Sequence, residues 1–142
     1  MRRELGEGFE LDDDRRRMDV AAVHAWLSRE SYWAVGRPYA VVALSVGEAS
    51  RVVGLYHGER QVGFARVVSD DLTFAYLADV YVLDEYRGRG LGEELVREAV
   101  ERGPHAGLKW LLHTADAHGL YRKLGFGPPG ERLMERPRPT PG

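Results

Sequence analysis

Residues 74–103 read FAYLADVYVLDEYRGRGLGEELVREAVERG. The first ten residues, 74–83, form a nearly continuous apolar run, which predicts a strand buried on both faces at the centre of a sheet. A polar, glycine-containing loop over residues 84–90 leads into apolar residues at helical spacing from residue 91 to near residue 103. A short strand is expected over residues 109–113, so the stretch predicts a strand–helix–strand unit with a right-handed crossover, typical of an α/β fold.

The rest of the chain predicts further short elements around this unit. A helix capped by Asp19 is expected after a weak strand, and a short helix is favoured over residues 38–46, where a buried strand is the alternative. Further strands are expected over residues 51–57 and 61–68 with a Gly58-Glu59 turn between them, a helix over 117–123, and weak or short strands over 8–11 and 131–135. We predict one domain over residues 1–142, with residues 136–142 as a frayed tail.

Composition excludes several classes of protein. The 142 residues contain 20 Lys plus Arg against 22 Asp plus Glu, and this net charge of -2 argues against a nucleic-acid partner. Cysteine is absent, which removes disulfides and thiolate chemistry. No apolar run approaches the length of a membrane span. We therefore expect a cytoplasmic enzyme or binding domain with no membrane partner.

The loop sequence Arg87-Gly88-Arg89-Gly90-Leu91-Gly92 carries the clearest chemical signal. Glycines allow close backbone approach, and the helix that starts there directs unpaired N–H groups and a positive dipole end toward a ligand. These are the features of a pyrophosphate site, to which Arg87 and Arg89 can add charge-assisted hydrogen bonds. The alternative is a glycine-rich turn with solvated arginines. The spacing fits neither the G-x-x-x-x-G-K-[ST] loop nor the G-x-G-x-x-G fingerprint.

Two motifs in this order resemble the GNAT superfamily of acyl-CoA-dependent N-acetyltransferases. The R-G-R-G-L-G run after Tyr81-Val82-Leu83 is similar to the superfamily's Q/R-x-x-G-x-G/A signature, and residues 119–126, GLYRKLGF, resemble its tyrosine-bearing helix that ends in Gly-Phe. The resemblance covers roughly residues 52–126. The longer string from residue 74 to residue 118 resembles a small bacterial subgroup.

The resemblance implies a GNAT fold and a binding mode for acetyl-CoA. The fold has a mixed, mostly antiparallel sheet, splayed between its fourth and fifth strands (residues 74–83 and 109–113 here), with helices on both faces. Pantetheine would lie along Val80, Tyr81 and Val82 like an added strand. The pyrophosphate would bind the loop formed by Arg87, Gly88, Arg89, Gly90, Leu91 and Gly92.

The resemblance also implies direct attack of a primary amine on the thioester, without a covalent enzyme intermediate. A strand N–H would hold the oxyanion, and Tyr121 takes the place of the general acid that protonates the leaving thiolate. Asp79, a carboxylate in an apolar strand, and His118, three residues before Tyr121, are the candidates for taking the proton of the amine. Each has a structural alternative, as a hydrogen-bonded core carboxylate or a half-exposed polar residue.

Other residues near the two motifs are expected to have structural roles or are excluded as metal ligands. Asp116 is expected to cap the helix over residues 117–123 and is discounted as a base. His113 and His118 have no third ligand at a metal-site spacing, so no metal is expected. Tyr121 alone would be read as a packed helix aromatic.

Acceptor recognition is expected from the first two helices and the loop between them. This region contains Trp26, Ser31, Tyr32 and Trp33. Most of its aromatic surface is expected to be core, with one ring facing the acceptor, and Ser31 or Arg37 could provide a polar contact. Small amines and peptide or protein amines both remain open as acceptors, and so does a homodimer. A non-catalytic acyl-CoA-binding module is the alternative to an enzyme.

Overall fold

The computed structural model describes residues 1–139 and has a six-stranded sheet in the order β1-β2-β3-β4-β5-β6. All neighbouring strands are antiparallel except β5 and β6, which are parallel. The elements in chain order are β1 (Arg2–Gly6), β2 (Phe9–Asp12), the 3-10 turn η1 (Arg15–Arg17), α1 (Val20–Glu30), α2 (Tyr39–Glu48), β3 (Arg51–His57), β4 (Arg60–Ser69), β5 (Phe74–Val82), the 3-10 turn η2 (Asp84–Tyr86), α3 (Leu91–Glu101), β6 (Lys109–Leu112) and α4 (His118–Lys123).

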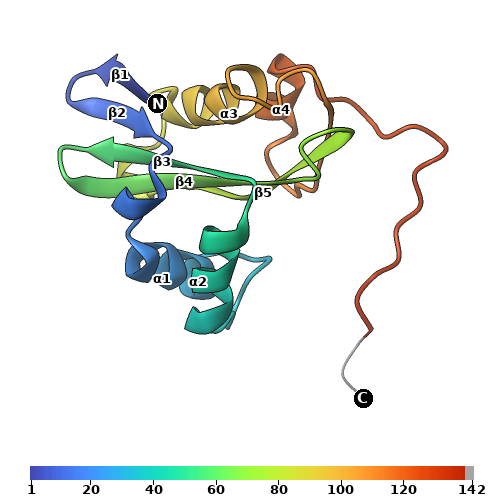
Figure 1. Cartoon of the computed structure of the whole chain (residues 1–142), viewed down its shortest axis with the longest axis horizontal. Coiled ribbons are helices and arrows are strands. Elements are labelled where there is room, and N and C mark those ends of the chain that lie inside the picture. The colour runs from blue at the N-terminus through green and yellow to red at the C-terminus, as the bar shows by residue number, and fades with distance from the viewer. Residues whose placement is uncertain (140–142) are drawn as a thin grey trace.

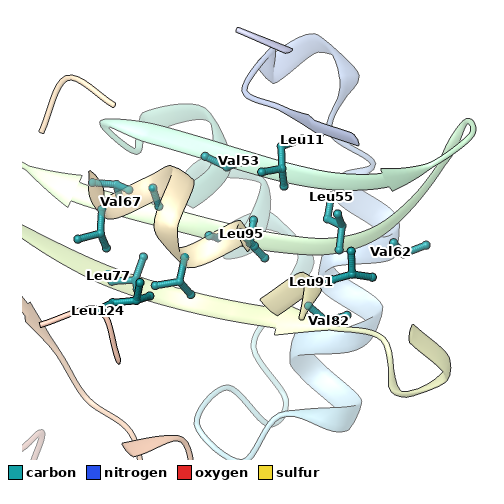
Figure 2. Packing of buried hydrophobic residues seen from close by; sticks show 14 of the residues in the cluster. Leu11, Val53, Leu55, Val62, Val67, Leu77, Val82, Leu91, Leu95 and Leu124 are labelled. Atoms are coloured by element: carbon teal, nitrogen blue, oxygen red, sulfur yellow. The ribbon is translucent and has the colours of Figure 1, made fainter. Parts of the chain in front are cut away.

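Helices cover both faces of the sheet, α1 and α2 on one side and α3 and α4 on the other (Figure 1). Leu91 and Leu95 of α3 pack on the inward side chains of the strands, as Figure 2 shows. A separate apolar cluster joins α1 and α2 to Phe64 and Tyr81 on the opposite face. This three-layer arrangement confirms the predicted α/β fold, and α1 is capped by Asp19 as expected. No helix within residues 1–139 has the length and apolar character needed to cross a membrane.

The long strand β5 is not central, which corrects the expectation from its apolar sequence. It is the fifth of six strands, and its buried residues alternate with half-buried ones. The half-buried side chains of Tyr76, Ala78 and Val80 line a cavity, and Val80 also packs against the apolar cluster that contains Leu91 and Leu95. An apolar run in a sequence can therefore belong to a strand that lines a cavity as well as to a strand that is buried on both faces.

The two ends of the chain also differ from expectation. β1 was not predicted from the sequence, and its residues are nearly all exposed because it is the edge strand of a hairpin with β2. The strand expected over residues 131–135 is wrong, since this segment has no strand and runs away from the sheet (Figure 1). Of the predicted tail, residues 136–139 are exposed and outside any helix or strand, and residues 140–142 lie outside the described part.

Two irregularities in β5 open the sheet. A bulge places Asp79 at a positive φ of 51°, and the register with β4 shifts there, between the Arg66–Ala78 and Phe64–Tyr81 pairs. The extra residue reverses the side-chain alternation, so that Asp79 and Tyr81 face α1 and α2. The pairing of β5 with β6 ends at Leu77, and the two strands separate beyond it, as the resemblance implied.

Candidate active site

A cavity of about 270 Å³ lies where β5 leaves β6. Its lining residues come from the α1–α2 loop, β4, β5, the segment that connects β6 to α4, and α4 itself. The polar and aromatic ones are Tyr32, Trp33, Arg37, Arg66, Tyr76, Asp79, His113, Thr114, Asp116 and Tyr121. The cavity therefore combines residues that are up to 89 positions apart in the sequence, from Tyr32 to Tyr121.

Asp79 is held on this cavity wall by three donors. The indole N–H of Trp33 donates to Oδ1 at 2.7 Å, while Arg37 Nη1 and Arg66 Nε donate to Oδ2 at 2.8 and 2.9 Å. Burial by itself raises the pKa of Asp79, but the charge of Arg66, the Trp33 hydrogen bond and the charge of Arg37 outweigh it, and the pKa is lowered. Asp79 is thus a buried, ionised carboxylate that fixes the positions of its three partners.

Tyr121 reaches the cavity from α4, a single short helix with a defined end. The N–H of Gly125 donates to the Arg122 carbonyl and that of Phe126 to the Tyr121 carbonyl, which is the Schellman pattern. Gly125 has a φ of 92°, which explains the glycine, and the Phe126 ring packs edge-on to Tyr121 at 5.8 Å. Burial raises the pKa of Tyr121 to about 12, and the nearby Tyr32 and Asp116 add to this effect. Its phenol is therefore protonated at neutral pH.

The open edge of β5 is formed by Val80 and Val82. Leu83 N donates to the Val62 carbonyl at 2.9 Å, so the peptide groups of Leu83 and Tyr81 face β4 and those of Val80 and Val82 face the gap. The Tyr81 side chain is buried on the other face of the sheet, where it stacks on Trp26 with ring centroids 4.4 Å apart. Of the three residues predicted along pantetheine, two thus present their backbone to the gap.

The glycine-rich loop has the geometry expected of an anion site. Gly90 is the left-handed N-cap residue of α3, with a φ of 77°, and Gly88 has a φ of 80°. A Cβ atom built on either glycine would have no atom within 4 Å, so protein packing does not require a glycine there and the space above the backbone is open. Arg89 lies over the rings of Phe9 and Tyr86, and Arg87 bonds the Val82 carbonyl at 3.2 Å.

The charges of the first turn of α3 are already compensated. Glu93 pairs with Arg97 at 3.0 Å and Glu94 with Arg102 at 3.3 Å. Leu91 and Gly92 form the first helical positions, whose N–H groups have no partner within a helix. The positive end of the helix is therefore available to an anion above Gly88 and Gly90.

Several residues predicted for the site lie elsewhere. Ser31 is buried and links the Leu27 carbonyl to the N–H of Ala34, a structural role. Trp26 packs on Tyr81, and His118 is exposed at the start of α4, outside the cavity lining. Tyr32 and Trp33, by contrast, line the cavity as predicted, together with Asp79 and Tyr121.

The expected helix cap at Asp116 is wrong. Ala117 is the N-cap residue of α4 and no side chain caps the helix, while the Ala117 N–H is bonded by Thr114 Oγ1 at 3.1 Å. Asp116 instead lines the cavity close to Tyr121. The short helix and its turn leave this carboxylate free of a capping role.

Sequence reasoning missed Arg66 and Tyr76, and it considered His113 only as a metal ligand. Tyr76 Oη lies 2.5 Å from His113 Nδ1, and His113 Nε2 lies 3.0 Å from Glu135 of the C-terminal segment. Arg66 was detectable as a charge inside an apolar strand, two residues from the buried Phe64 and so on the same face. The His113 contact depends on the parallel pairing of β5 and β6. Within residues 1–139, no three His, Asp or Glu side chains are grouped to hold a metal ion.

Comparison with known proteins agrees with this architecture. Residues 17–126 match the model of the acetyltransferase (GNAT) family. A crystal structure of a GNAT-family protein from Xanthomonas campestris pv. campestris has a TM-score of 0.86 and 40% sequence identity, and covers 92% of this chain and 94% of that chain. A Gibberella zeae protein named for an inferred acetyltransferase activity is 30% identical over 137 residues, 82% of this chain and 77% of the relative.

A shorter match concerns a protein from Bacillus subtilis strain 168. Its name assigns it, by inference, N-acetylation of alanine on ribosomal protein bS18, and it is 37% identical over 71 residues, 46% of this chain and 45% of the relative. The family model, in contrast, spans well over half of the chain. The chain therefore belongs to the GNAT family of acetyltransferases.

Proposed function

We propose that this protein transfers the acetyl group of acetyl-CoA to a primary amine by direct attack in a ternary complex. The observation that carries the proposal is the cavity at the split between β5 and β6. The Tyr121 phenol, the open β5 edge and the Asp79 cluster all line this cavity. The glycine-rich loop begins only a few residues beyond the same strand edge. Donor and acceptor would thus meet in one cavity.

The donor would be held mainly by backbone groups. Val80 offers its N–H and carbonyl groups and Val82 its N–H group to the pantetheine amides, as an edge strand does to an added strand. The Val82 carbonyl already accepts a hydrogen bond from Arg87. The N–H groups at the start of α3 and the exposed Arg87 and Arg89 suit the pyrophosphate. A peptide N–H of β5 near the cavity would hold the oxyanion.

Tyr121 would supply the proton for the leaving group. The neutral amine nitrogen bonds to the carbonyl carbon, the carbon–sulfur bond breaks, and the thiolate takes the phenolic proton. The phenolate then regains a proton from the nitrogen of the new amide. The raised pKa of Tyr121 ensures that the phenol enters the reaction protonated.

A relay from Tyr76 to His113 would take the first proton from the ammonium group. The Glu135 carboxylate would accept from His113 Nε2, which leaves Nδ1 of a neutral imidazole to accept from the Tyr76 hydroxyl. As the Tyr76 oxygen accepts a proton from the ammonium, its own proton passes to Nδ1. Asp79 is a poor base because two arginines hold it ionised, and we propose that it positions Trp33, Arg37 and Arg66.

The test combines calorimetry with a thiol-release assay. Acetyl-CoA should bind, and free CoA should appear only when an amine from a panel of amines, amino acids and peptides is present. Binding of acetyl-CoA without thiol release for any acceptor would favour the non-catalytic binding module. Acetylation confined to peptides would favour the activity named for the Bacillus subtilis relative.

A further inference from the structure

The cluster formed by Arg37, Arg66 and Asp79 on the cavity wall has one more positive charge than negative charges. Arg37 and Arg66 both bond the same oxygen of Asp79, and the other oxygen is taken by Trp33. The arginine side chains are 22% and 18% exposed and that of Asp79 is 3% exposed, so this cluster is largely shielded from water. Two guanidinium groups share one carboxylate, and the cluster has a net charge of +1.

Each arginine also keeps hydrogen-bond donors for a ligand. Arg37 uses only Nη1 and Arg66 only Nε on Asp79, and no other side-chain acceptor is found for either within residues 1–139. Both arginines line the cavity. A guanidinium fork binds a planar carboxylate with two parallel N–H groups, and its geometry here is fixed in advance by Asp79. The cluster is a preformed site for a monoanionic group.

The cavity lining also includes a negative charge outside the Asp79 cluster. Asp116 and the Tyr121 phenol lie there, and the thioester would lie beside Tyr121. A molecule with an ammonium group and a carboxylate would place each against its complement. A phosphate would bring about two negative charges to a cluster with a net charge of +1, so a carboxylate matches better.

We propose that the acceptor is a small amine that also carries a carboxylate, as an amino acid does, and that Arg37 and Arg66 bind this carboxylate while the amine faces Tyr121. The inference rests on the proposed acetyl transfer. The cavity volume of about 270 Å³ suits a small molecule. The N-terminal residue of a peptide lacks a free α-carboxylate and would leave the arginine donors unused.

Matched amine pairs test the proposal by thiol release. Phenylalanine is compared with phenethylamine, alanine with ethylamine, and phosphoethanolamine serves as the phosphate arm. We expect kcat/KM to be on the order of 10- to 100-fold higher for the carboxylate member of each pair. Arg37→Gln and Arg66→Gln should remove that preference, while Arg29→Gln, an exposed arginine of α1, should keep it. Equal kcat/KM within the pairs, or preference for peptides or phosphoethanolamine, would overturn the inference and leave acetyl transfer standing.

A binding measurement separates this inference from failure of the proposed function. 3-Phenylpropionate has the carboxylate but no amine, and 3-phenylpropionamide is its neutral match. Titration of each into the protein, followed by tryptophan fluorescence, should show a response of Trp33 to the carboxylate that Arg37→Gln removes. If the amide binds as well as the carboxylate, the inference is wrong whether or not any amine is acetylated.

Discussion

Tyr121 illustrates how one side chain gains its role from burial. Its ring packs against Phe126 at the end of α4, and its phenol lines the cavity with a pKa of about 12. A pKa raised above the usual value near 10 means that the proton is retained throughout the physiological range. At neutral pH the residue therefore enters each catalytic cycle as a proton donor and not as a base.

Tyr121→Phe should lower turnover by roughly a hundredfold or more, because it removes the acid and keeps the ring. The affinity for acetyl-CoA and the Tm should change little. Steady-state kinetics with one identified acceptor, calorimetry and thermal unfolding measure the three quantities. Unchanged turnover with chemistry rate-limiting would assign Tyr121 to packing. The wild-type rate should show no alkaline decline from this phenol below about pH 10.

The pH dependence of three variants separates positioning from proton transfer. Asp79→Asn should lower kcat/KM equally from about pH 6 to pH 10, because a carboxylate with a lowered pKa is already ionised over this range. His113→Gln should lose activity near neutral pH and regain much of it at high pH, where free amine is abundant. His118→Gln, at the exposed start of α4, is the matched histidine control. Recovery of Asp79→Asn or His118→Gln at high pH would identify that residue as the base.

At the scale of elements, the loop that enters α3 combines two left-handed glycines with a free helix N-terminus. Gly90→Val should abolish acetyl-CoA binding in calorimetry, since the branched Cβ would occupy the open space above the loop. Gly58→Val is a matched control, because Gly58 has a φ of 62° and equally open surroundings in the β3–β4 turn. Both variants should lose comparable stability, of about 1–3 kcal/mol. Equal acetyl-CoA affinity in the two variants would refute the assignment of the loop.

The sequence was most informative where local pattern determines structure. The strands over residues 51–57 and 61–68, the helix after Asp19 and the glycine-rich loop were all predicted within one or two residues. The Arg37–Arg66–Asp79 cluster was not, because it depends on a bulge that reverses the alternation of β5. Hydrophobic periodicity does not show where a strand has a bulge or which strand pairs with its edge.

At the scale of the whole molecule, one buried ion network joins three distant elements. Glu98 of α3 is fully buried and bonds Arg51 of β3 at 3.2 Å and Arg3 of β1 at 2.6 Å. Arg51 also reaches Asp13 at 3.1 Å, and a Cβ at Gly103 would collide with its guanidinium. The apolar helix pattern gave no sign that a carboxylate would occupy the buried face of α3.

Glu98→Gln should reduce the free energy of unfolding by about 3 kcal/mol, because it leaves the buried Arg51 with only the partly exposed Asp13 as a charge partner. Glu94→Gln, on the same helix in an exposed pair with Arg102, should change it by less than about 0.5 kcal/mol. Urea unfolding of both variants provides the comparison. Similar losses in the two variants would mean that the network contributes no more than a surface pair.

The early end of the β5–β6 pairing has a consequence for the lifetime of the protein. The amides of Val80 and Val82 face a gap, so their hydrogens should exchange with deuterated solvent faster than those of β3 and β4 until a donor molecule covers them. A ligand at a hundred times its Kd adds about 2.7 kcal/mol to the stability of the folded state. Resistance to proteolysis should then rise with the supply of acetyl-CoA, and the chain would persist longest in cells that are rich in its substrate.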